Sequence, residues 1–180
     1  EAFFAELEQV ATQTDYRPEA AELWYDRIVA FGELISTSII SEYLGTHGIP
    51  NRWLDMRRCF RTNDRHKDAT VDIAASQPLL QEAMKERPAR IYIGQGFIGG
   101  APDGTTTTLG REGSDYSAAV AANILNAESM SVWKDVDGVM NADPKAFPDA
   151  VQITELNYLD TIELAYSGAQ IIHPKTIKPL

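Results

Sequence analysis

The apolar positions of the first fifty residues repeat every three or four places, as they do on one face of an α-helix. The first run consists of Phe3, Phe4, Leu7 and Val10. A second helical stretch is expected from Pro18, which suits the first turn of a helix, to Leu44. The N-terminal part of the chain, about residues 1–50, is therefore predicted to be helical.

After residue 50, short apolar runs alternate with further helical patterns. Strands are predicted at residues 51–56, 89–93, 131–133 and 170–172. Helices are predicted at 70–85, with Thr70 as the cap, at 114–125, at 158–166 and from His173 onward. Strands that alternate with helices predict an α/β fold, in which a mainly parallel sheet is sandwiched by helices.

The composition is typical of a folded globular protein, with 180 residues of which 44% are apolar and 23% charged. The formal net charge of −10 argues against binding to nucleic acid or to an anionic membrane surface. No apolar run reaches the roughly 20 residues that a membrane-spanning helix needs. The single Cys59 excludes an intramolecular disulfide and a cysteine zinc site, and it suits a reducing, cytoplasmic setting.

One segment departs from the acidic character of the chain. Residues 51–68 are rich in arginine, although several acids lie among the cations. We expect this basic segment to be solvated or to pair with the acidic N-terminal helices rather than to bind nucleic acid. The three histidines, His47, His66 and His173, lack the spacing of a metal site, so no metal ligands are predicted.

Three glycines after the second predicted strand, Gly94, Gly96 and Gly99, match the dinucleotide-binding pattern G-x-G-x-x-G. That pattern works only where the glycines open a helix whose N-terminus meets the pyrophosphate. Here a Pro-Asp-Gly turn at 102–104 and four threonines at 105–108 predict a hairpin and a strand instead. Binding of NAD or FAD is therefore not expected.

The strongest candidate for chemistry is the segment 109–119. Two glycines in it flank Arg111 and Glu112, after which Ser114 and Asp115 begin an alanine-rich helix. Ser114 or Asp115 could cap this helix, whose first-turn amides and dipole form an anion site. Arg111 adds a planar fork suited to a carboxylate or a phosphate. The alternative is an ordinary helix cap beside a surface arginine.

Six blocks of the sequence resemble, in the same order, the signature of the aspartate kinases, a family of the amino-acid-kinase superfamily. The blocks lie at residues 31–37, 53–64, 96–99, 106–119, 133–145 and 168–174. Together they extend over about residues 30–178. The resemblance implies the carbamate-kinase-like α/β fold of that superfamily, here incomplete at the N-terminus.

The resemblance also implies an activity. Aspartate kinases phosphorylate the side-chain carboxylate of L-aspartate to 4-phospho-L-aspartate, the first step of lysine, threonine and methionine biosynthesis. The expected cofactors are ATP and Mg²⁺, and the expected full-length protein is a cytoplasmic homo-oligomer. Two alternatives stay open. One is another amino-acid kinase, acting on glutamate or acetylglutamate, and the other is a noncatalytic binding module that kept the fold.

By the same resemblance, the substrate pocket is formed by the first and fourth blocks. Glu33 would hold the ammonium group of aspartate, and Arg111 would clamp a carboxylate. Gly113 and Ser114 would line the same pocket. The expected catalytic residues are Arg111 and Asp115. Asp115 would orient the site through a lysine rather than act as a base, because the substrate carboxylate is already ionised at neutral pH.

The nucleotide site that the resemblance implies lies in the last two blocks. Its residues are Lys134, Asp135, Met140, Lys145, Gln170 and Ile171. Lys145 is the best candidate for a phosphate contact. Met140 and Gln170 stand where a tyrosine and a lysine are often found, so a second cation would have to come from elsewhere, with Lys134 as a candidate. Without the resemblance, Lys134 and Lys145 would be interpreted as solvated loop charges.

Two features of aspartate kinases are not found in the 180 residues. One is an N-terminal Lys-Phe-Gly-Gly-Thr-Ser motif on the first strand, and the other is the pair of regulatory ACT domains. We therefore expect residues 1–180 to be a partial catalytic domain, with a helical part at about 1–50 and a nucleotide-side part at about 126–180. Little activity is expected of this piece alone.

Overall fold

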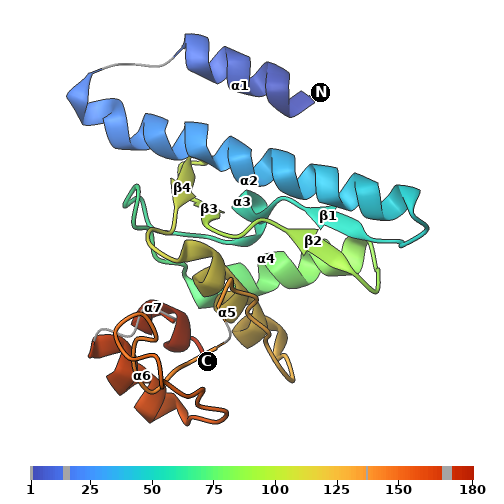
Figure 1. Cartoon of the computed structure of the whole chain (residues 1–180). Coiled ribbons are helices and arrows are strands. Elements are labelled where there is room, and N and C mark those ends of the chain that lie inside the picture. Colours follow the sequence, from blue (N-terminus) through green and yellow to red (C-terminus); the bar gives the residue numbers. More distant parts are fainter. Residues whose placement is uncertain (1, 14–16, 137, 168–171) are drawn as a thin grey trace.

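The computed structural model describes residues 2–13, 17–136, 138–167 and 172–180. Its N-terminal part is helical, as the apolar periodicity predicts. Helix α1 (Ala2–Thr12) packs on the long helix α2 (Ala21–Thr46), and a 3-10 turn at Pro18–Ala20 leads into α2. Figure 1 shows the two helices lying together on one side of the remaining elements.

Three helices form the middle of the chain. They are α3 (Met56–Cys59), α4 (Ile73–Glu86) and α5 (Gly113–Leu125). The Asp55 carboxylate caps α3, so the predicted strand ends before Met56. Helix α4 begins three residues later than predicted because Asp72, and not Thr70, accepts the hydrogen bond of the Ala75 amide.

The parallel pair of strands lies between the helices. Strands β1 (Arg52–Leu54) and β2 (Tyr92–Gly94) run side by side, with Trp53 opposite Ile93. Helix α2 lies on one side of this pair and α4 on the other (Figure 1). The predicted α/β fold, with parallel strands sandwiched by helices, is confirmed.

The second pair of strands is antiparallel. Strands β3 (Ile98–Gly100) and β4 (Thr106–Thr108) form a hairpin, with Gly99 opposite Thr107. The hairpin and the threonine strand are therefore as predicted. Because the glycine pattern leads into β3 and not into a helix, Gly94–Gly99 do not form the strand–turn–helix of a dinucleotide-binding site.

Two apolar clusters hold these layers together. The first joins α3, α4 and α5 through Met56, Phe60, Leu80, Val120 and Ile124. The second joins α1, α2 and β3 through Val10, Ala30, Phe31, Leu34 and Ile98. The start of α5 and the loop between β2 and β3 lie where the two clusters meet, so the segment with the strongest predicted chemistry stands on a packed support.

Helix α2 is the only helix in the described part of the chain with the length and composition to cross a membrane. Of its most apolar window, 22% is buried, and its inner face contacts the rest of the chain. Asp26 is fully buried on it and accepts hydrogen bonds from the Thr108 amide and hydroxyl, at 2.9 and 2.6 Å, and from the Lys67 amide at 3.0 Å. His66 Nδ1 lies 2.9 Å from the same carboxylate. A buried charge with this many partners fits a folded protein interior.

The basic segment 51–68 pairs with the acidic N-terminal helices, as predicted. Arg57 lies 3.8 Å from Glu6 on α1, and Lys67 lies 4.0 Å from Glu22 on α2. Both contacts involve partly exposed side chains, so each contributes at most about 1 kcal/mol. Together with the hydrogen bonds of Asp26, these two contacts fix segment 51–68 against the N-terminal helices. Fewer cations of the segment are then free to bind an external partner.

The C-terminal part forms helices α6 (Tyr158–Tyr166) and α7 (Pro174–Ile177), the latter capped by His173 as the sequence predicts. The predicted strand at 131–133 is wrong. Those residues are irregular, and the Trp133 side chain is 94% exposed. A short apolar run becomes a strand only beside a partner strand, and no described strand pairs with it. Ile172 is not in a strand either, while residues 170 and 171 lie outside the described residues.

Candidate active site at the start of helix α5

The turn before α5 is shaped by two residues with positive φ. Gly110 has φ 77° and Glu112 has φ 53°, both in the left-handed region. Gly113 then packs against Phe97, and a Cβ atom at this position would lie 2.8 Å from the Phe97 ring. Leu109 donates its amide to the Phe97 carbonyl at 2.8 Å. The glycines therefore let the turn fold closely over the β2–β3 loop.

The start of α5 is not capped as predicted. Neither Ser114 nor Asp115 is the N-cap; that position belongs to Glu112, whose side chain makes no capping hydrogen bond. Its left-handed backbone points the carboxylate elsewhere. No side chain caps the first-turn amides of α5, although the Gly113 amide donates to the Gly110 carbonyl at 3.0 Å. Free amides at a helix start attract anions. The expected cap at Ser114 or Asp115 is wrong, and the anion site stays a prediction.

The β2–β3 loop lies directly against α5. A Cβ atom on Gly96 would lie 2.7 Å from Cβ and 2.8 Å from Cα of Ser114. The Phe97 amide donates to Ser117 Oγ at 2.9 Å, and this hydroxyl donates to the Gly113 carbonyl at 2.8 Å. The glycine pattern thus serves close packing of loop and helix. Its contacts hold Ser114 at the exposed rim of the site.

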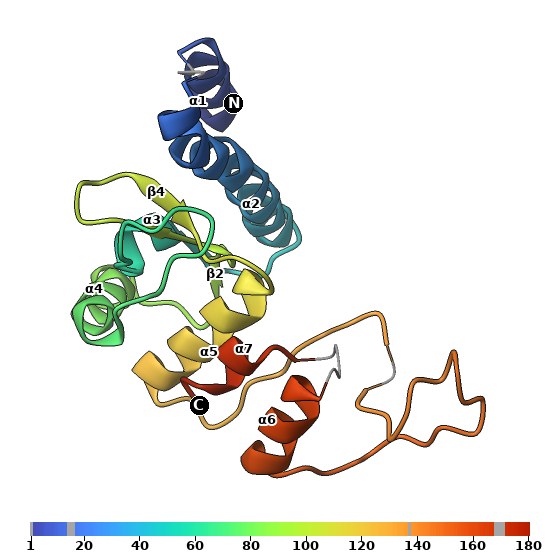
Figure 2. The ribbon, with the colours of Figure 1, turned by 90° about the vertical axis from the view of Figure 1, so that its left-hand side faces the viewer.

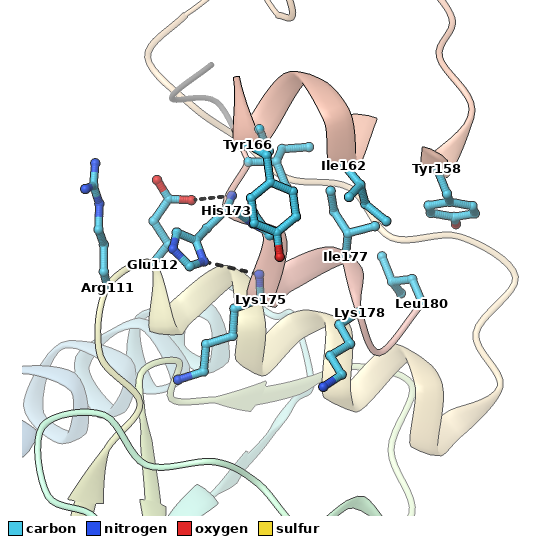
Figure 3. A pocket seen from close by; sticks show the side chains of 13 residues that line it. Arg111, Glu112, Tyr158, Ile162, Tyr166, His173, Lys175, Ile177, Lys178 and Leu180 are labelled. Carbon is cyan, nitrogen blue, oxygen red and sulfur yellow. Dashed lines mark hydrogen bonds between the residues drawn. The ribbon is translucent and has the colours of Figure 1, made fainter. Parts of the chain in front are cut away.

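Arg111 projects from the turn with its guanidinium unengaged. The residue is exposed, and no hydrogen bond or ion pair joins it to another side chain in the part of the chain that the structure describes. Figure 3 shows it standing apart from Glu112 and from the residues of the neighbouring cavity. A free fork next to an uncapped helix start can bind a carboxylate or a phosphate with two parallel hydrogen bonds.

Asp115 is paired with a lysine, as predicted. Lys134 Nζ lies 2.7 Å from Asp115 Oδ2 and 3.7 Å from Glu112 Oε2. The close contact with the Asp115 carboxylate raises the pKa of the Lys134 ammonium, and Glu112 adds to the effect. Lys134 is therefore held in its charged form next to Asp115, in the first turn of α5. The catalytic roles of Asp115 and Arg111 stay predictions.

Glu33 lies on the face of α2 that approaches the β2–β3 loop. The neighbouring Thr37 donates to the Glu33 carbonyl at 2.6 Å and accepts from Gln95 Nε2 at 2.9 Å. The Glu33 side chain is half-buried, and burial raises its pKa. None of the described residues forms an ion pair with it or donates a hydrogen bond to it. A partly desolvated carboxylate without a partner is suited to an ammonium group from outside the chain.

Three further predicted nucleotide residues, Asp135, Met140 and Lys145, lie on the long loop between α5 and α6. Figure 2 shows this orange loop extending away from α5. Met140 forms an isolated bridge with Gln152, and the Lys145 amide donates to Asp143 at 2.9 Å. Asp135, Met140 and Lys145 have no described contact with α5, so only Lys134 of this set reaches the site. Gln170 and Ile171 lie outside the described residues.

Sequence reasoning missed the part that Glu112 and Lys175 take in this region. Glu112 Oε2 accepts a hydrogen bond from the His173 amide at 3.0 Å. Lys175 Nζ donates to the carbonyls of Leu109 and Ala69, at 2.8 and 3.2 Å, and lies 3.0 Å from Asp68. These contacts tie α7 to the turn before α5. The sequence offered one signal for these contacts, which is that Glu112 lies between the predicted site residues Arg111 and Gly113.

A cavity of about 1060 Å³ adjoins the site, between the start of α5 and helices α6 and α7. Arg111, Glu112 and His173 stand at one end of it, and Tyr158, Ile162 and Leu180 at the other (Figure 3). Among the described residues, no group of three histidine, cysteine or acidic side chains could hold a metal ion. The arrangement can bind anions.

Comparisons with known proteins agree with the predicted resemblance. Residues 3–180 match the model of the Amino acid kinase family. The chain is 38% identical to lysine-sensitive aspartokinase 3 of Escherichia coli (strain K12) over 180 residues, which are 97% of this chain and 40% of that protein. It is 36% identical to the chloroplastic bifunctional aspartokinase/homoserine dehydrogenase 1 of Zea mays over 162 residues, 89% of this chain and 18% of that protein.

A solved structure gives the same result. Escherichia coli aspartokinase III in complex with aspartate and ADP (R-state) matches with a TM-score of 0.87 and 36% identity, over 99% of this chain and 40% of that chain. The chain thus spans less than half of the length of these relatives. The predicted resemblance to aspartate kinases is confirmed, and the match over nearly all its residues shows that the chain belongs to the amino acid kinase family.

Proposed function

We propose that this chain is part of an aspartate kinase, which transfers the γ-phosphoryl group of MgATP to the side-chain carboxylate of L-aspartate. One observation carries the proposal. At the start of α5, Lys134 Nζ lies 2.7 Å from the Asp115 carboxylate, and the exposed Arg111 lies in the turn that leads into the same helix. The reaction joins two anions, and it needs fixed cations where they meet.

The proposed substrate residues bind oppositely charged groups of aspartate. Arg111, with the exposed Ser114 and the neighbouring Gly113 of the same turn, binds a carboxylate of aspartate. Glu33 binds its ammonium group, for which it is half-buried and without a described partner. These contacts orient the side-chain carboxylate for in-line attack on the γ-phosphorus. No base has to remove a proton, because the nucleophile is an ionised carboxylate.

Lys134 and Asp115 complete the site from the nucleotide side. Lys134 neutralises charge on the transferring phosphoryl group, and Asp115 is the positioning residue that fixes Lys134. Asp135, Met140, Lys145, Gln170 and Ile171 are proposed to bind the remainder of ATP. Mg²⁺ would arrive with the phosphates and water as its main ligands. We assign it no protein ligand.

We further propose that the 180 residues are a partial catalytic domain of a longer protein, with the helical part at about 1–50 and the nucleotide side at about 126–180. This agrees with the 40% of the Escherichia coli relative that the chain covers. The full-length protein is proposed to be a cytoplasmic homo-oligomer that needs neither nucleic acid nor membrane. The free, buried Cys59 suits a reducing compartment.

An ADP-release assay on the full-length protein tests the function. L-Aspartate should support turnover, whereas L-glutamate and N-acetyl-L-glutamate should not. Arg111→Gln should raise KM for aspartate by at least about tenfold, because it removes a charged fork. The control Arg58→Gln changes an exposed arginine and should leave KM unchanged. Turnover of another amino acid would favour a different kinase, and binding without turnover would favour a noncatalytic module.

A further inference from the structure

We propose that Glu112 is a positioning residue that couples occupancy of the nucleotide side of the site to occupancy of the aspartate side. This inference rests on the proposed function and goes beyond it. None of the residues assigned above gives a reason why a glutamate should stand inside an anion-binding turn. A carboxylate there repels both substrates unless its charge is engaged elsewhere.

The Glu112 carboxylate is engaged by two separate segments of the chain. It accepts a hydrogen bond from the His173 amide at 3.0 Å, which Figure 3 shows as a dashed line, and it lies 3.7 Å from Lys134 Nζ. Lys134 belongs to the loop that follows α5, whereas His173 caps α7. One side chain therefore joins both segments of the proposed nucleotide side to the turn that holds Arg111.

The backbone of Glu112 supports this role. Its φ of 53° and ψ of 30° are unusual for a residue with a side chain, and no capping hydrogen bond to α5 compensates for them. Glycine would adopt this conformation freely, so the retained side chain points to its contacts with His173 and Lys134 as the reason for it. The strained residue lies directly between Arg111 and Gly113, in the middle of the substrate turn.

A shared tether of this kind has a thermodynamic consequence. Phosphate that engages Lys134 shifts the balance between its contacts with Asp115 and with Glu112. Through Glu112, the change reaches Arg111 and the first-turn amides. If one ligand alters the affinity for the other by some factor, the reverse effect has the same size. We expect bound ADP to strengthen aspartate binding by about fivefold or more, and aspartate to strengthen ADP binding equally.

Isothermal titration of the full-length protein tests the coupling. The dissociation constant of L-aspartate is measured with and without saturating MgADP, and the ratio of the two values is compared between variants. Glu112→Ala removes both contacts and should bring the ratio close to one. Glu112→Gln keeps an acceptor for the His173 amide but loses the charge facing Lys134, so its ratio should fall between those of Glu112→Ala and the wild type.

The matched control is Glu128→Gln, which neutralises an exposed acid just after α5 and should keep the wild-type ratio. If Glu112→Ala does not fold, the ratio measured for the isosteric Glu112→Gln is compared with the wild-type ratio instead. A wild-type ratio of one, or a wild-type ratio retained in the Glu112 variants, would overturn the inference while leaving the kinase proposal intact. A wild-type protein that binds neither ligand would overturn the proposed function and the inference with it.

Discussion

Asp115 on α5 and Lys134 on the loop that follows the helix form an ion pair of 2.7 Å. The pair joins the start of α5 to the loop of the proposed nucleotide side, and the proposed chemistry depends on it. It leaves Arg111 free while it keeps a second cation in place. The first two predictions concern its two members separately.

Lys134→Gln should lower kcat by about a hundredfold, because it removes a fixed cation from the transferring phosphoryl group. KM for aspartate should change much less, since Arg111 and Glu33 remain. Steady-state kinetics of the full-length protein measure both values. Lys85→Gln, in the last turn of α4, is the matched control and should behave as the wild type. Equal kcat in the two variants would remove Lys134 from the mechanism.

Asp115→Asn should return the pKa of Lys134 toward its ordinary value, since contact with this carboxylate is the main cause of the upward shift. A raised pKa in the folded state gives stability that is complete below the ordinary value of 10.5 and is lost as pH rises through the folded value. The wild type should therefore exceed Asp115→Asn in stability at pH 7, and the difference should shrink above pH 10.5. Urea unfolding as a function of pH measures it, and a pH-independent difference would contradict the ion-pair account.

Glu33→Gln should stabilise the fold and impair binding at the same time. Burial raises the pKa of Glu33 because the ionised carboxylate loses part of its hydration on folding. This desolvation lowers the stability of the folded protein at neutral pH. The variant should unfold at higher urea concentration than the wild type at pH 7, and this advantage should vanish below the ordinary pKa of 4.5. Aspartate affinity should fall at least about tenfold with the loss of the charge. Lower stability at pH 7 would mean that the carboxylate has an unrecognised partner.

Gly96→Ala should destabilise the protein by about 1–3 kcal/mol, because the new methyl group would meet the backbone and side chain of Ser114. Gly45→Ala is the control. It lies in α2 with nothing within 4 Å of the new atom, and it should be neutral or stabilising by up to about 1 kcal/mol. Urea unfolding compares the two. Similar effects at both positions would show that the close approach of loop and helix is unimportant.

Asp26→Asn should cost at least about 2 kcal/mol of unfolding free energy, because an amide cannot replace a carboxylate that accepts from Thr108 and Lys67 together. Asp64→Asn, at an exposed position of the same basic segment, should be nearly neutral. Chemical denaturation of both variants is sufficient. A small effect of Asp26→Asn would show that these hydrogen bonds contribute little to stability.

Much of the fold follows from the sequence because most elements carry their own signals. The period of the apolar residues locates α1 and α2, and the Pro-Asp-Gly turn with its threonines locates the β3–β4 hairpin. The wrong strand at 131–133 shows the limit of such signals. An apolar run of three residues has no preference of its own, and its structure depends on whether a partner strand stands beside it.

The candidate site follows from the sequence only in part. Arg111 and Ser114 stand out because glycines and a helix start surround them. The family resemblance implied that Asp115 contacts a lysine, but it did not identify Lys134 as that lysine, since no local pattern joins the two residues. Glu112 could not be assigned in advance. Its role depends on a left-handed backbone and on the His173 amide, 61 positions along the chain, and neither property is visible in residue type.

The solvent exposure of Trp133 has a practical consequence. Its indole stands in water immediately before Lys134, whereas Trp24 and Trp53 are both partly buried in the N-terminal layers. The chain therefore carries an intrinsic fluorophore next to the ion pair on which the proposed chemistry depends. A ligand that binds at Lys134 should reduce the access of a soluble quencher to the Trp133 indole. Fluorescence quenching can therefore follow binding without an added label.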